Sequence, residues 1–145
     1  MKRIYCILFS TLTFSVASSQ IIIENNPPNN SPSYLINSIL LGGGVSAFNH
    51  IFQGDSSQIG FFNGVNSNSG IDSGIVLSSG NIFDLVGPNA SGSTSTGFSL
   101  PGDPTLDAVI FPDLTNDAAV LEFDFMPTSD TITFKYVFGS EEYLE

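Results

Sequence analysis

The sequence predicts a mainly β fold, an antiparallel β-sandwich of jelly-roll type with one short helix near its N-terminus. Three observations favour this class. Apolar and polar residues alternate with a period of two in the C-terminal third, as in half-buried antiparallel strands. Short apolar runs recur between turns rich in Gly, Ser, Asn and Asp. The chain also has thirteen Phe and no Trp, which supplies bulky side chains for a core between two sheets.

Residues 1–19 have the composition of a secretory signal peptide. Lys2 and Arg3 form the positive start, an apolar run follows over 4–16, and small residues at 17–19 provide a cleavage site. The apolar run is shorter than the roughly 20 residues that a membrane-spanning helix needs. We therefore expect export, cleavage after residue 19, and no transmembrane segment in the mature chain.

The charge of the mature chain is strongly negative. Cleavage leaves Lys135 as the one basic residue against fourteen acidic ones, a formal charge of −13. Such a chain lacks the cationic surface that phosphates require, which argues against nucleic acid or anionic lipid as a partner. The single cysteine, Cys6, lies in the signal segment, so no disulfide stabilises the exported fold. The stability that a disulfide would supply must then come from the size of the core, from neighbouring domains or from bound metal ions. The many carboxylates favour calcium, which prefers oxygen ligands. The alternative explanation of the carboxylates is that they only keep an exported protein soluble.

The N-terminal part of the mature chain is predicted as a linker followed by a helix. Residues 20–33 form the linker, because Asn and Pro dominate 24–33 and nothing there is periodic; the apolar start at 21–23 suits a sheet edge. A helix is predicted over 32–41, with Ser31 as N-cap, Pro32 at the first position and glycines after its end. Its apolar face comprises Leu35, Ile36, Ile39 and Leu40.

Residues 34–145 are predicted to form one β domain. The predicted strands are 45–52, 58–62, 74–78, 108–111, 120–125 and 131–138. The last two alternate most clearly and are joined by turn residues at 126–130, so we expect a hairpin with Lys135 opposite Glu122 or Asp124. The Gly- and Ser-rich stretch 78–103, with a helical turn at 82–85, has the length of a functional loop.

Several phrases of the chain recur together in a known family. They are LLGGGV (40–45), SGIVLSSG (73–80), GPN (87–89), GD (102–103) with Leu106, DAAVLEFDFMP (117–127) and FKYVFGSEEY (134–143). In this order and spacing they resemble the choice-of-anchor L domain of surface proteins from gliding bacteria. The resemblance implies a secreted or outer-surface protein, type IX secretion, and no enzymatic activity. It also implies that the domain continues beyond Glu145 with a further strand and that further domains of the same chain follow.

Carboxylates supply the candidate site. Asp103 and Asp107, together with Glu141 and Glu142, offer the oxygen atoms that calcium prefers, and no other cofactor is expected. The alternative is that Asp103 caps a turn and that one Glu caps a strand end while the other is solvated. Glu141 and Glu142 make a poor catalytic pair, because adjacent side chains of an extended chain point to opposite sides.

Three other features are predicted to have structural roles. His50 has no second His or Cys near it in the sequence and is predicted to lie at the surface, without a zinc site or a catalytic dyad. Asp117 is predicted as a turn or cap residue. The glycines at 42–44 follow a helix rather than precede one, which rules out a phosphate loop.

The expected function is that of a non-enzymatic exported cell-surface module for adhesion or matrix interaction, with a protein or glycan ligand and calcium as stabilising ion. Two alternatives stay open. A carbohydrate-binding or carbohydrate-active module would use Tyr136, Tyr143 and the long loop as a platform. A structural spacer would have no ligand.

Overall fold

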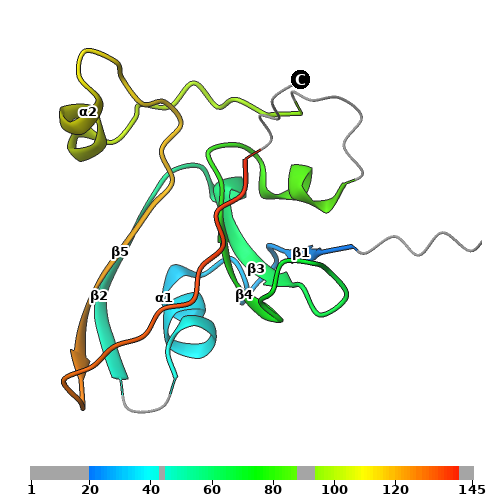
Figure 1. The fold of residues 1–145 in the computed structure, drawn as a ribbon, viewed down its shortest axis with the longest axis vertical. Helices are drawn as coiled ribbons and strands as arrows, with labels where there is room; N and C mark the ends of the chain where they lie inside the picture. The colour runs from blue at the N-terminus through cyan, green and yellow to red at the C-terminus, as the bar shows by residue number, and fades with distance from the viewer. Residues whose placement is uncertain (1–19, 43–44, 88–93, 141–145) are drawn as a thin grey trace, which may run out of the picture.

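The computed structural model describes residues 20–42, 45–87 and 94–140 (Figure 1). Within these ranges the chain forms two antiparallel sheets. The first contains β1 (Ile22–Glu24), β3 (Ile59–Asn63) and β4 (Ser73–Leu77) in the order β1-β3-β4. The second pairs β2 (Val45–Gln53) with β5 (Val120–Pro127). The predicted mainly β, antiparallel architecture is confirmed.

The predicted N-terminal helix is present between these sheets (Figure 1). It starts as α1 (Pro32–Tyr34) and continues as a π-helical segment, η1 (Leu35–Leu40). The Ser31 hydroxyl accepts a hydrogen bond from the backbone N–H of Tyr34 at 3.5 Å, as the N-cap prediction requires. The helical segment contacts both sheets, so it links them.

The core is small and lies on the three-stranded sheet. Its buried apolar side chains come from β1, η1, β3 and the 3₁₀ turn η3 (Ile82–Val86): Ile23, Leu35, Ile36, Ile59 and Ile82. Of the apolar helix face that the sequence predicts, Leu35 and Ile36 are buried and Leu40 is exposed. Residues 20–33, predicted as a linker, thus contribute β1 at the edge of the sheet and a side chain to the core.

A β-bulge interrupts the β2–β5 pairing. Phe48 is opposite Asp124 and Ile51 is opposite Glu122. Two residues of β2, Asn49 and His50, therefore face a single residue of β5, which increases the local twist. Asn49 has a φ of 53°, a left-handed conformation that Asn tolerates better than most residues.

The predicted strand at 108–111 is wrong. These residues lie at the end of the helix α2 (Pro104–Ile110) and just after it. The β-branched residues favour a strand, but Asp103 caps the helix and Pro104 occupies its first turn. These start signals outweigh the intrinsic preference of Val109 and Ile110.

The predicted hairpin of 120–125 with 131–138 is also wrong. β5 pairs with β2, and residues 131–138 are exposed and without regular secondary structure. Alternation shows that a segment can form a strand, whereas the choice of partner depends on tertiary arrangement. The other predicted strands and the helical turn at 82–85 are confirmed within one or two residues.

Candidate functional site

Residues 100–118 form an excursion from the β domain, with α2 at its tip. The two ends run side by side: Pro101 and Asn116 form an antiparallel bridge. The N–H of Asp117 donates to the Leu100 carbonyl at 3.0 Å, and that of Ala118 to the Pro101 carbonyl at 3.2 Å. Figure 1 shows α2 projecting away from both sheets. We refer to residues 100–118 as the α2 excursion.

Thr115 connects the two aspartates of the predicted calcium site. The Asp103 N–H donates to Thr115 Oγ1 at 2.8 Å. Asp107 Oδ1 accepts from both the N–H and the hydroxyl of Thr115, each at 2.6 Å. The Thr115 hydroxyl, and then its N–H, hold the pKa of the Asp107 carboxyl below its usual value. The excursion is therefore closed by side chains as well as by its backbone.

In the structure, the carboxylates of Asp103 and Asp107 both accept hydrogen bonds from backbone N–H groups. Asp103 Oδ1 accepts from the N–H groups of Thr105 and Leu106, each at 2.9 Å, which caps α2 as the turn interpretation predicts. Glu141 and Glu142 lie outside the described residues. Within 20–42, 45–87 and 94–140, no group of three or more His, Cys, Asp or Glu side chains is arranged to hold a metal ion. Calcium binding thus stays a prediction.

The tip of the α2 excursion is apolar and open to solvent. Val109, Phe111 and Leu114 are 79%, 81% and 69% exposed, and Leu106 and Ile110 are also exposed. All five lie on α2 or within four residues of its end, so exposed apolar side chains are concentrated in one short segment. Isolated exposed apolar residues are ordinary, whereas such a concentration makes the segment a candidate for interaction. We call these five residues the apolar tip. The sequence prediction missed it because residues 108–111 were assigned to a strand.

Asp117 and Gln58 attach the excursion to the core. Asp117, a predicted cap residue, accepts from the N–H groups of Leu100 at 2.6 Å and Phe98 at 3.2 Å. Its own carbonyl accepts from Gln58 Nε2 at 2.8 Å. Gln58 is fully buried, and its Oε1 accepts from the Asp55 N–H at 2.6 Å. The spacing Asp55-x-x-Gln58 is a capping-box signal that the sequence contains.

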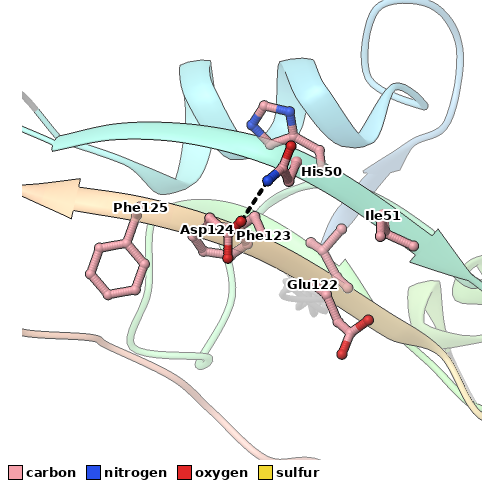
Figure 2. A pocket seen from close by; sticks show the side chains of 8 residues that line it. His50, Ile51, Glu122, Phe123, Asp124 and Phe125 are labelled. Atoms are coloured by element: carbon pink, nitrogen blue, oxygen red, sulfur yellow. Dashed lines mark hydrogen bonds between the residues drawn. The ribbon is translucent and has the colours of Figure 1, made fainter.

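A second candidate surface surrounds the bulge. A hollow of about 810 Å³ is lined by Asn49, His50, Ile51 and residues 121–125. Asn49 Nδ2 donates to Asp124 Oδ2 at 2.6 Å, the dashed line in Figure 2. Glu122 and Asp124 share one face of β5, because side chains of a strand alternate. The hollow is thus lined by acidic and apolar groups together.

His50 in this lining is paired with a side-chain amide. His50 is half-buried, and its Nε2 lies 3.2 Å from the side-chain amide of Asn37. In the described structure its partner is therefore an amide, whereas an activated nucleophile needs a hydroxyl or thiol beside the base. The sequence predicted His50 at the surface, and the structure places it half-buried on β2.

Comparison with known proteins gives one family. No curated protein and no solved structure is significantly similar to the chain. Among the described residues, no helix has the length and apolarity to cross a membrane. The family model of the choice-of-anchor L domain matches residues 23–145, which include the α2 excursion and all of both sheets except Ile22 at the start of β1. The chain therefore belongs to the choice-of-anchor L domain family.

Proposed function

We propose that this chain is a non-enzymatic, exported module of a cell-surface protein that binds another protein in adhesion or matrix interaction. Membership of the choice-of-anchor L family, which indicates an extracellular or surface module, supports the location. The apolar tip supports the mode of action. Secretion by a type IX route in a gliding bacterium, which the family resemblance implies, belongs to the same proposal. A type IX sorting module at the far end of the open reading frame would test that part.

The apolar tip suits protein binding for two physical reasons. Burying an exposed apolar side chain of this size gains about 1.5–3 kcal/mol, and the tip offers Val109, Phe111 and Leu114 together. The bonds between Thr115 and Asp107 and the Asp117 stem already order the excursion. A pre-ordered surface loses less conformational entropy on binding, so more of the burial energy appears as affinity.

The test is a binding screen with matched variants. The protein would be passed over purified extracellular proteins in surface plasmon resonance, and over a glycan array. We expect protein binding that Val109→Asp or Phe111→Asp weakens about thirty-fold, the equivalent of a hot-spot loss of about 2 kcal/mol. Val65→Asp is the control, because Val65 is an exposed valine outside the excursion (63% exposed). Equal loss in the control would contradict the proposal.

A carbohydrate-binding function is the second candidate, and one observation favours it. Tyr136 is 85% exposed, and an open aromatic ring can stack on a sugar. Binding to array glycans that disappears with Tyr136→Ala but persists with Phe111→Asp would replace the protein-binding proposal. If the protein screen and the glycan array both show no binding, a structural spacer without a ligand is the remaining interpretation.

Calcium belongs to the proposal as a stabilising ion. Asp103 and Asp107 use their Oδ1 atoms in the α2 excursion, and Glu141 or Glu142 would supply the further oxygen ligands that calcium needs. Millimolar calcium should then raise Tm, and a chelator should reverse the rise. If neither calcium nor the chelator changes Tm, the calcium part of the proposal is wrong.

A further inference from the structure

Residues 131–138 have the sequence of a strand but no strand partner in the described structure. Ile132, Phe134, Tyr136 and Phe138 alternate with Thr131, Thr133, Lys135 and Val137. All eight are exposed and without regular secondary structure, and the side chain of Phe138 is 87% exposed. Its first residues lie beside Leu40–Gly42 and Val45 of the same chain, and the Thr131 carbonyl accepts a hydrogen bond from Ser129. The rest of the segment has no strand beside it in the described structure and carries an apolar row, a combination that favours pairing with another strand. We call residues 131–138 the free segment.

β5 has an edge that is not paired with another described strand, and the free segment could pair there. It pairs only with β2 among the described strands, so its other edge carries unpaired N–H and C=O groups. β2 likewise pairs with a single described strand, but the helical segment packs against β2, where the His50 side chain meets Asn37. In Figure 1 the two strands run side by side, and the arrow end of β5 lies on the outer side of β2. The open position for an additional strand is thus along β5.

The charges of the two elements are complementary. Lys135 is the one basic residue of the described chain, and it lies in the middle of the free segment. Glu122 and Asp124 project from one face of β5. An antiparallel register that places Lys135 opposite either carboxylate also places Phe134 and Tyr136 on the face of β5 that carries Leu121, Phe123 and Phe125. One alignment therefore satisfies both the charged row and the apolar row.

We propose that the free segment pairs with β5 of a second copy of this chain, reciprocally, to form a two-fold symmetric dimer. Exchange of an identical element between protomers is a low-cost route to a dimer. Only residues 128–130 separate β5 from the free segment, and a short hinge favours exchange over an internal hairpin. This inference does not depend on the apolar tip or on the proposed protein binding, although it places Tyr136, the residue of the carbohydrate-binding candidate, in the dimer interface.

Long-range charge does not prevent this dimer. Two acidic copies repel one another, but physiological salt screens charges separated by more than about 8 Å. Cross-strand neighbours are about 5 Å apart, so the contacts of Lys135 with Glu122 or Asp124 act inside that distance. The contacts of Lys135 with Glu122 or Asp124 therefore decide whether charge stabilises or destabilises the dimer at the edge of β5.

Charge exchange distinguishes pairing between copies from pairing within one copy. In multi-angle light scattering the protein should be dimeric. Lys135→Glu, or the double variant Glu122→Lys with Asp124→Lys, should each weaken the dimer about tenfold, because two pairs per dimer change from attraction to repulsion. Lys135→Arg is the matched control and should stay dimeric.

Mixing the two weakened variants provides the decisive result. Each then meets a partner of opposite charge in both halves of the dimer, so the heterodimer should form with the affinity of the unaltered chain. An internal hairpin predicts no effect of mixing. A monomeric parent protein, or failure of the mixture to dimerise, would overturn the proposal.

A covalent test follows from the same geometry. Glu122→Cys with Lys135→Cys should give a linked dimer of the mature chain on a non-reducing gel, because the chain's one natural cysteine, Cys6, lies in the signal segment. A disulfide confined to single chains would contradict exchange between copies.

Discussion

Replacing Gln58 by Leu is the sharpest test of how the excursion is attached to the core. The Gln58 side chain is fully buried and takes part in three hydrogen bonds. Its Oε1 accepts from the Asp55 N–H, and its Nε2 donates to the carbonyls of Ser79 at 3.0 Å and Asp117 at 2.8 Å. Leucine has a similar volume, so the change removes the bonds without leaving a large cavity.

The magnitude follows from the groups that lose their partners. One N–H and two carbonyls remain in a partly buried environment, and each unsatisfied group costs about 1–3 kcal/mol. Since water reaches part of this region, we expect the free energy of unfolding to fall by about 3 kcal/mol. That is a large share of the roughly 5–15 kcal/mol typical of a domain.

Urea unfolding measures this loss as a shift of the midpoint at constant m-value. Gln53→Leu is the matched control, because Gln53 is exposed at the end of β2. Hydrogen exchange should also show faster exchange of the Phe98 and Leu100 N–H groups, which bond to Asp117. A Gln58→Leu protein as stable as the Gln53→Leu control would refute the assigned role of Gln58.

Three further predictions concern the excursion and the bulge. Gly102→Ala should lower stability by about 1–3 kcal/mol, because an added Cβ would overlap the Thr115 hydroxyl and carbonyl oxygens; Gly42→Ala, which has open space around it, should have a much smaller effect on thermal unfolding. For Asp107, the lowered pKa in the folded state means that its stabilisation is complete above the unfolded pKa and is lost as pH falls through the folded one. The Tm difference between the natural protein and Asp107→Asn should therefore be largest above about pH 5 and shrink in more acidic buffer; a constant difference would contradict the assignment. Asn49→Val should lower Tm through about 1–3 kcal/mol of strain at the positive φ, whereas Asn49→Gly should lose mainly the bond to Asp124; equal melting of the two variants would argue against the bulge.

Local signals predicted the elements that they specify directly. Ser31 and Pro32 start the N-terminal helix as predicted, and the alternation at 120–125 marks β5. The phrases at 117–127 and 134–143 pointed to the family that the family model confirms. Each of these features depends on residues close together in the chain, which is why pattern alone was sufficient.

The errors arose where local signals compete or where a partner must be chosen. At 108–111, β-branched side chains favoured a strand, but Asp103 and Pro104 begin a helix that includes them. That error concealed the apolar tip, because the apolar residues were assigned to a buried strand. Asp103 and Asp107 were predicted as calcium ligands, which stays a prediction; their bonds to the α2 backbone and to Thr115 involve positions up to twelve residues away.

The sequence alone determined the β class, most strand positions, the acidic and cysteine-free character of residues 20–145, and the family. It did so because periodicity, capping and composition are properties of short segments. The tertiary structure was needed to show that β5 pairs with β2, that Gln58 joins the excursion to the core, and that Val109 and Phe111 face solvent. Strand pairing and burial depend on which distant segments meet, and the same alternating pattern is compatible with several partners.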